Sequence, residues 1–203
     1  IAGPRYVGPE LRTRPDGSKD DLWGVPRKEV RVGPPGREAV YMEVTAAPLA
    51  EATTVQAIED YPRWPSADWW DYSEIAQQCQ GHPGYCVVNM GDRLDRTAQL
   101  KPAMYLRGVE QIMLDLAMTP EIVEAMVERI TAYFLEYNRR VFAAAGGKID
   151  IFMMGDDFGM QNAPLCSVDM WRRFFKKGFR QYIALAHQHG RQHGYKAFGL
   201  HEL

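Results

Sequence analysis

Residues 148–171 read KIDIFMMGDDFGMQNAPLCSVDMW, and the expected fold depends on the pattern in this stretch. It begins with an apolar run at residues 149–154, whose length and β-branched and aromatic content suit a strand buried on both faces, although periodicity alone also allows a helix. Gly155 ends the run, and a polar loop then reaches Pro164. Ser167 is well placed as the N-cap of a new helix. The stretch is therefore expected to run strand, loop, helix.

Two adjacent carboxylates, Asp156 and Asp157, follow the expected strand directly after the glycine. In α/β proteins catalytic groups gather where strands end and loops begin, so this pair is a candidate wall of an active site. An acidic pair beside a glycine is also a common way to build a turn and cap a backbone. The sequence alone allows both interpretations.

Length and composition indicate a globular protein with one sizeable core. The chain has 203 residues, of which 46% are hydrophobic and 25% charged, and its net charge is −2. This balance gives no electrostatic reason to expect nucleic acid or an anionic membrane as a partner. Residues 1–17 lack the apolar core of a signal peptide, and no apolar run approaches a bilayer-spanning length. We therefore expect a cytoplasmic protein.

The cysteines and histidines do not predict a metal site. The three cysteines are widely spaced and form no C-x-x-C pair, which argues against a disulfide framework and against a zinc site built from cysteines alone. Two histidines two residues apart on a helix do not share a face, so a solvated helix end is the expected role of the C-terminal histidines. These residues are Cys79, Cys86, Cys166, His187, His189, His193 and His201.

The remaining chain is expected to alternate short strands with helices. Nine of the thirteen prolines lie in the first 65 residues, so residues 1–38 are expected to be largely irregular. Strands are expected at residues 28–32, 38–44 and 85–90, and helices at 55–61, 73–80, 104–116, 122–145 and 167–186. Apolar strand runs alternating with helices are typical of βαβ units, which predict an α/β sheet or barrel.

Two further features are candidates for binding a ligand. The expected strand at residues 85–90 also ends in glycine and an acid, and Arg93 or Arg96 in the following loop could bind a carboxylate bidentately. Four aromatic residues crowd residues 64–72, where they either line a pocket for a flat ligand or supply core area. These are Trp64, Trp69, Trp70 and Tyr72.

Taken in order, several short motifs resemble the uroporphyrinogen decarboxylase superfamily, which also contains the corrinoid-linked methyltransferases. Each motif is short, but their order and spacing together are fairly specific, and they cover the chain from about residue 20 to about residue 190. They are DLWGVP at residues 21–26, APL at 47–49, YP at 61–62, LRGVEQ at 106–111 running to Asp115, TPE at 119–121, GDDFG at 155–159, PL at 164–165 and MW at 170–171.

The resemblance implies a (β/α)8 barrel with its active site at the C-terminal ends of the strands. Asp21 matches the family aspartate that binds pyrrole NH groups, where a carboxylate stabilises the positive charge that develops on the ring. Asp156 and Asp157 match the substrate-facing loop, in which Phe158 and Gln161 are candidate substrate contacts. Together these residues are the expected site.

The activity implied by the resemblance is loss of a porphyrinogen carboxylate, which needs no cofactor. The alternative within the family is methyl transfer involving a corrinoid protein, where zinc activates a thiol. The chain departs from both branches. It lacks the arginine-rich N-terminal signature of the decarboxylases, and it ends before any His-x-Cys motif of the methyltransferases.

The number of expected strands is small for a complete barrel. About four buried strands can be found where a closed barrel needs eight, so residues 1–203 are expected to form one partial barrel domain. An open barrel exposes a sheet edge and core, which predicts a homo-oligomer. A third interpretation is a noncatalytic fragment or binding module that a partner chain completes.

Overall fold

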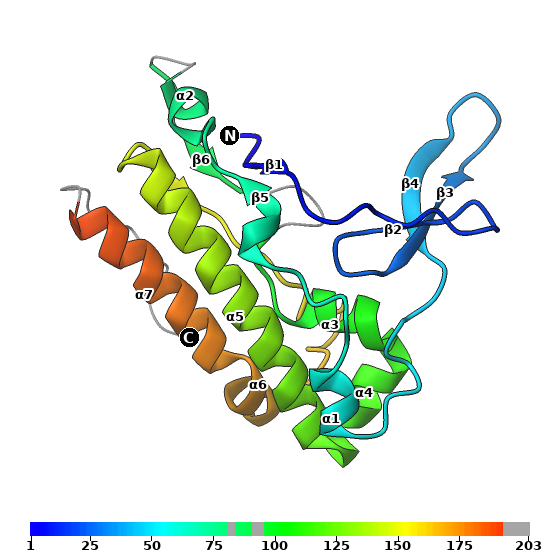
Figure 1. The fold of residues 1–203 in the computed structure, drawn as a ribbon. Coiled ribbons are helices and arrows are strands. Elements are labelled where there is room, and N and C mark those ends of the chain that lie inside the picture. Colours follow the sequence, from blue (N-terminus) through cyan, green and yellow to red (C-terminus); the bar gives the residue numbers. More distant parts are fainter. Residues whose placement is uncertain (81–83, 91–95, 193–203) are drawn as a thin grey trace. The chain divides into compact units, whose positions relative to one another are not determined.

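The computed structural model describes residues 1–80, 84–90 and 96–192 (Figure 1). Contacts divide the chain into two compact units. The first comprises Ile1–Gly8, Ser66–Lys101 and Val127–Leu203, and the second comprises Pro9–Pro65 and Pro102–Met126. Helices and short strands occur in both, so the expected mixed α/β class is confirmed. The expectation of one barrel domain over residues 1–203 stays a prediction.

The first unit combines two small sheets with long helices. Strand β1 pairs antiparallel with β5, and β6 pairs parallel with β7. Its elements are β1 (Arg5–Tyr6), η1 (Ala67–Trp69), β5 (Trp70–Asp71), α2 (Ile75–Gln80), β6 (Val88–Asn89), the start of α3 (Leu100–Arg107), α5 (Pro120–Ala145) from Val127 onward, β7 (Ile151–Phe152), α6 (Val168–Phe174) and α7 (Lys176–Gln192).

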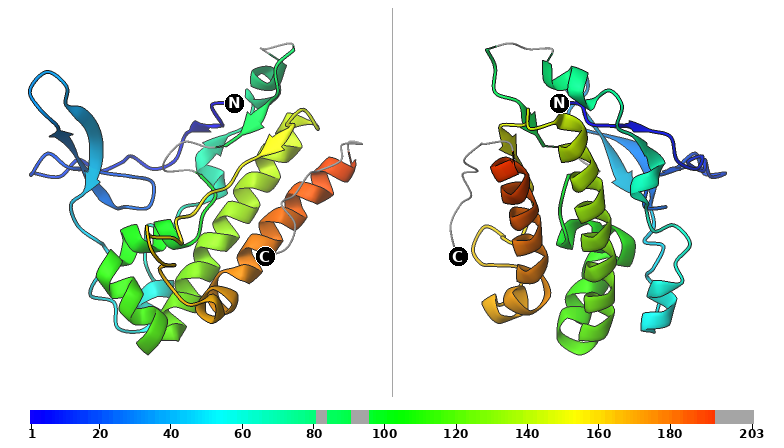
Figure 2. Two further views of the ribbon diagram at one scale, coloured as in Figure 1. Left: turned by 180° about the vertical axis from the view of Figure 1, so that it is seen from behind. Right: turned by 60° about the vertical axis from the view of Figure 1, so that its left-hand side comes forward.

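Helices α5 and α7 lie side by side and form much of this unit's core (Figures 1 and 2). The Phe134 ring of α5 meets the buried Tyr182 ring of α7 edge to face, with centroids 6.4 Å apart. Helix α5 ends where expected, because Gly146 and Gly147 have positive φ angles of 57° and 79°. The helix expected at residues 167–186 is instead two helices, α6 and α7, separated at Phe175.

The parallel pairing of β6 with β7 confirms the expected relation between these two strands, but their expected burial is wrong. Ile151 is 49% exposed and Met153 is 42% exposed. Their neighbour Phe152 points the other way and packs against Phe142 of α5 at 5.2 Å between ring centroids. A parallel strand is buried on both faces only when other elements pack against both faces of its sheet. In this unit α5 packs against the face that bears Phe152.

The second unit contains an antiparallel three-stranded sheet and short helices. The sheet order is β2-β3-β4, and the β3–β4 hairpin confirms the pair of strands expected around the turn at residues 33–36. The elements are β2 (Lys19–Asp20), β3 (Pro26–Val32), β4 (Ala39–Val44), α1 (Val55–Glu59) capped by Thr54, the rest of α3, α4 (Val109–Met118) and the start of α5.

The helix expected at residues 104–116 is interrupted, and a buried ion pair braces the two pieces. Gly108 has a φ of 89°, which separates α3 from α4. Arg107, at the end of α3, places Nε 2.7 Å from Asp115 of α4, and its Nη1 donates to the Leu49 and Ala50 carbonyls. Both side chains of the ion pair are at most 4% exposed.

The sheets among the described residues have two, three and two strands, and none closes into a barrel. Closure would need a continuous ring of paired strands. The (β/α)8 barrel therefore stays a proposal. In the part of the chain that the structure covers, no helix has the length and apolar character required to cross a bilayer.

Candidate functional site

The candidate site lies at the carboxyl edge of the parallel β6–β7 pair. Because parallel strands point the same way, the segments that follow them leave from one edge of the sheet. The segment after β7 contains the acidic loop, defined here as residues 155–159. The segment after β6 is described again from Arg96 onward, and the Gly155 amide donates to the Thr97 carbonyl at 3.1 Å. The two segments are therefore neighbours.

Asp156 caps the first turn of α3. One carboxylate oxygen accepts the backbone amides of Gln99 and Leu100, both at 2.6 Å, and the other accepts the amide of Lys101 at 2.8 Å. Burial raises the pKa of the Asp156 carboxyl above its ordinary value, while the three amide hydrogen bonds oppose this by favouring the charged form. Asp156 therefore holds the acidic loop against the start of α3.

Asp157 has the opposite surroundings. Its side chain is 75% exposed and pairs with the Lys101 ammonium, 2.7 Å away. A surface ion pair of this kind contributes little stability and exchanges readily with other partners. Asp157 is therefore the carboxylate of the pair that is accessible to a ligand.

A buried polar cluster fixes the segment that receives the acidic loop. Gln99 is fully buried, and its amide donates to the Phe175 carbonyl at 3.1 Å and accepts from Thr131 at 3.3 Å. Asn138 of α5 donates to the Thr97 hydroxyl at 2.8 Å. Gly178 of α7 lies against Gln99 so closely that any added Cβ would overlap the Gln99 amide. The α3 start is thus held by α5 and α7.

Of the two candidate arginines, Arg96 belongs to this region and Arg93 lies outside the described residues. Arg96 is half-buried, and its aliphatic Cδ lies 3.3 Å from the place a Cβ on Gly155 would take. Its Nε is buried and has no hydrogen-bond partner among the described residues. A buried donor without a partner is costly, and a change of the Arg96 side-chain conformation would let it bond to a carboxylate on a ligand.

Phe158 and Gln161, the other expected substrate contacts, have different surroundings. Phe158 packs against three aromatic rings, the nearest being Phe175 at 4.9 Å between centroids, with Trp171 and Phe179 beyond. This arrangement makes Phe158 the apolar anchor of the acidic loop. Gln161 is exposed in the turn closed by the bridge between Gly159 and Pro164.

Asp21 lies in the second unit, where it forms a buried ion pair. Its Oδ2 is 2.7 Å from Arg27 Nε, and its Oδ1 accepts the amides of Trp23 at 2.8 Å and Val25 at 3.1 Å. Burial raises the pKa of the Asp21 carboxyl, and Arg27 opposes that rise. Arg27 stacks over Tyr105 at 4.4 Å, and its Nη2 has no hydrogen-bond partner in the described chain. The expected meeting of Asp21 with Asp156 and Asp157 stays a prediction.

The aromatic residues at positions 64–72 are half-buried and make contacts within their own units. The Trp70 indole donates to the Tyr133 hydroxyl at 3.0 Å, and the Trp64 indole donates to the Ile58 carbonyl at 2.7 Å. The Tyr72 hydroxyl donates to the Ala67 carbonyl at 2.9 Å. The polar tips of these three side chains are therefore already bonded within the protein.

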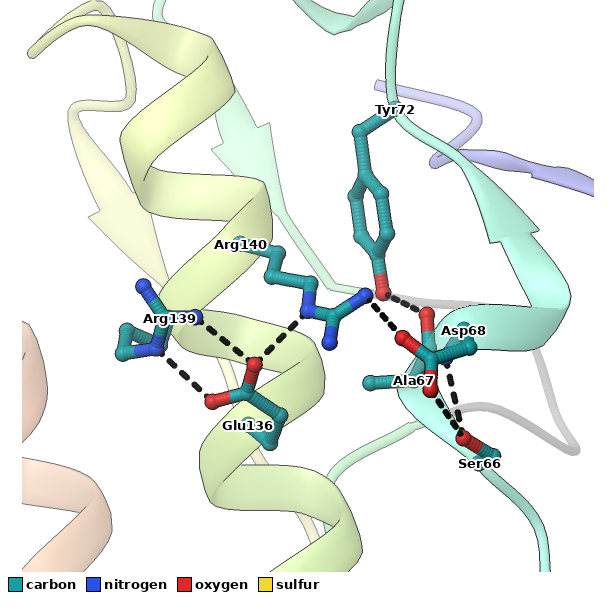
Figure 3. Close-up of polar contacts among 7 residues, drawn as sticks. All are labelled: Ser66, Ala67, Asp68, Tyr72, Glu136, Arg139 and Arg140. Carbon is teal, nitrogen blue, oxygen red and sulfur yellow. Dashed lines mark hydrogen bonds and ion pairs between the residues drawn. The ribbon is translucent and has the colours of Figure 1, made fainter.

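Sequence reasoning missed a charge network on α5 (Figure 3). Glu136 accepts from both Arg139 and Arg140 at 2.7 Å, and Arg140 also pairs with Asp68 at 2.7 Å. These interactions lower the pKa of Glu136 to about 2. The i,i+3 and i,i+4 spacings on one helix indicate the Glu136 part of the network, whereas nothing in the sequence indicates its link to Asp68.

The described residues contain no group of three or more metal-ligating side chains. Cys79 is buried, Cys166 is half-buried and Cys86 is exposed. His193 and His201 lie outside the described residues.

Comparisons with known protein families, with curated proteins and with solved structures gave no match to the chain. The resemblance to the uroporphyrinogen decarboxylase superfamily therefore rests on the motifs within the sequence itself.

Proposed function

We propose that the protein is an enzyme of the uroporphyrinogen decarboxylase type, acting on a tetrapyrrole-like substrate at the carboxyl edge of β6 and β7. The observation that carries the proposal is the pairing of an anchored acid with an accessible one in a single loop at this edge. That arrangement suits a site in which one carboxylate fixes the loop and the other meets the ligand.

In the proposed reaction, a pyrrole ring is protonated before carbon dioxide leaves, so positive charge develops on the ring. A carboxylate held near that ring stabilises the charge as it forms. Asp157 is the proposed ligand-facing carboxylate, and Asp156 is its positioning residue through α3. Arg96, whose Nε has no partner among the described residues, is the proposed contact for a substrate carboxylate.

Asp21 is proposed as a second acid that faces the ring. Its ion pair with Arg27 and its two amide hydrogen bonds hold the carboxylate in one orientation. Such preorganisation is what electrostatic stabilisation of a cationic intermediate requires, because the charge is already in place when the reaction occurs.

The alternative within the superfamily is corrinoid-dependent methyl transfer. The two activities are separated by incubating the purified protein with uroporphyrinogen and by measuring its zinc content. Loss of substrate carboxylates without bound zinc supports the decarboxylase. Stoichiometric zinc together with thiol methylation by a methylated corrinoid protein supports the methyltransferase and contradicts the decarboxylase.

A second candidate function, of a different class, is a binding module that a partner chain completes. The exposed apolar side chains of β7 favour it, because Ile151 and Met153 form a sheet face that a parallel sheet normally covers. Two results together would support this function. The protein would neither turn over a porphyrinogen nor transfer a methyl group, and its β7 amides would become protected from hydrogen exchange when a partner is added.

A further inference from the structure

The β3–β4 hairpin of the second unit has an open edge. Strand order β2-β3-β4 places β4 at the end of its sheet, and no other strand among the described residues pairs with its outer side. Five of its six residues are exposed, including Val40 at 53%, Tyr41 at 37% and Met42 at 44%. A long edge strand rich in apolar residues is a template for pairing with another strand.

The register of the hairpin determines which backbone groups of β4 point outward. The Thr45 amide donates to the Pro26 carbonyl at 2.9 Å, so this opposed pair is hydrogen-bonded. Pairs alternate along an antiparallel ladder, which makes Glu43 and Tyr41 bond to β3 as well. The amide and carbonyl groups of Val40 and Met42 therefore face away from β3 and are available to another strand.

We propose that β4 pairs with β4 of a second copy of the protein, antiparallel and about a two-fold axis at Tyr41. In this register Val40 lies opposite Met42 of the second copy. The outward-facing amide and carbonyl groups of the two strands can then bond to one another. Tyr41 lies opposite its own counterpart in a non-hydrogen-bonded pair, where side chains approach most closely. Val30 flanks Tyr41 on each side, so a continuous apolar row crosses four strands.

Charge complementarity and the overlap of the two strands together select this register over its two neighbours. Glu43 becomes the diagonal neighbour of Arg37 in the second copy, and the two-fold axis repeats the pair. Both residues are exposed in the single chain. Shifting the axis to Met42 places Glu43 opposite Tyr41 and moves Arg37 beyond the diagonal. Shifting it to Val40 places Glu43 directly opposite Arg37, but it pairs only residues 39–41 of β4 with their counterparts, whereas the axis at Tyr41 pairs residues 39–43. A second copy therefore fits this edge through its own charges as well as through its backbone.

The proposal is tested by sedimentation of the whole protein over a concentration series. The wild-type protein is expected to show a reversible monomer–dimer equilibrium. Arg37→Glu and Glu43→Lys each replace two attractive pairs by two repulsive ones, so each variant alone should raise the dimer dissociation constant by roughly tenfold or more. An equimolar mixture of the two variants should form a heterodimer at near wild-type strength, because both diagonal pairs are again of opposite charge.

Arg31→Glu is the matched control. It makes the same change of charge on the neighbouring strand β3, away from the proposed contact, and should leave the dimer unchanged. Met42→Pro removes an outward-facing amide without removing a bond to β3, so it should abolish the dimer while the far-ultraviolet circular dichroism spectrum is kept. A wild-type protein that stays monomeric overturns the proposal. So does a mixture of the two charge variants that remains as weak as either alone.

Discussion

Asp156 and Asp157 are adjacent in sequence but occupy opposite environments. The three amide hydrogen bonds of Asp156 and the exposure of Asp157 separate a structural acid from an accessible one. Asp156→Asn keeps the shape of the side chain but replaces one acceptor oxygen by an NH2 donor, which leaves a backbone amide at the start of α3 without its acceptor, so it should lower the free energy of unfolding by about 1–2 kcal/mol.

Asp157→Asn is the matched control at the neighbouring position. It removes one surface ion pair, so it should change the free energy of unfolding by less than about 0.5 kcal/mol. Urea denaturation followed by circular dichroism measures both variants. Equal losses of stability would contradict the division of roles between the two acids.

Gly178 is the residue at which helix propensity and packing oppose each other. Alanine is favoured over glycine by up to about 1 kcal/mol in helix propensity alone, and Gly178 lies in the first turn of α7. The Cβ of an alanine here would overlap the fully buried Gln99 amide and crowd Thr131, so overpacking should prevail and Gly178→Ala should destabilise the protein by about 1–3 kcal/mol.

Gly159→Ala provides the comparison for this substitution, because nothing lies within 4 Å of the Cβ it would add. Its unfolding free energy should stay within about 0.5 kcal/mol of the wild-type value. If Gly178→Ala stabilised the protein, Gln99 would have to move easily. This result would contradict the conclusion that α5 and α7 hold the start of α3 in place.

At the scale of elements, the sequence predicted types better than boundaries. The β3–β4 hairpin and the glycine end of α5 were predictable, because local residue chemistry determines each of them. A threonine cap of α1 was also predictable, but the sequence allows Thr53 or Thr54, and the structure has Thr54. The break between α3 and α4 at Gly108 was missed, because the apolar pattern of a single helix continues across this glycine.

Burial of β7 was mispredicted for a different reason. The apolar run at residues 149–154 carries the same composition whether or not a second layer covers it. Likewise, Asp156 and Asp157 look identical in the sequence, and only the tertiary position of α3 distinguishes them. Local patterns predict elements, whereas exposure and hydrogen-bond partners depend on contacts between distant segments.

The network on α5 gives a pH prediction at this scale. Arg139 and Arg140 lower the pKa of Glu136 from its ordinary 4.5 to about 2, so the folded state holds this carboxylate charged more strongly than the unfolded chain does. Its contribution to stability is fully present above about pH 4.5 and is lost as the pH falls toward about 2.

The side chains are partly exposed, so the contribution of Glu136 should be below about 1 kcal/mol. A carboxyl titration by nuclear magnetic resonance should place the midpoint of Glu136 near 2, and Glu136→Gln should flatten the stability profile in this range. A midpoint at the ordinary value would mean that the network in Figure 3 does not persist in solution.

At the scale of the whole molecule, two incompletely covered surfaces stand out among the described residues, and each suits a different kind of partner. The face of β7 that bears Ile151 and Met153 belongs to the proposed catalytic edge, where a ligand or a partner chain would complete the sheet. The edge of β4 offers backbone groups and paired charges, which suit self-association. Activity measurements test the first surface, and sedimentation tests the second.

The proposed function requires Asp157 to meet a tetrapyrrole-like substrate at the carboxyl edge of β6 and β7. The most direct measurement is the rate of carboxylate loss from uroporphyrinogen by the wild-type protein, Asp157→Asn and Asp169→Asn, the last being another exposed acid in a surface ion pair. We expect the rate to fall by about a hundredfold or more in Asp157→Asn and to stay unchanged in Asp169→Asn. A wild-type protein without turnover, or an Asp157→Asn variant as active as the wild type, would contradict the proposed function.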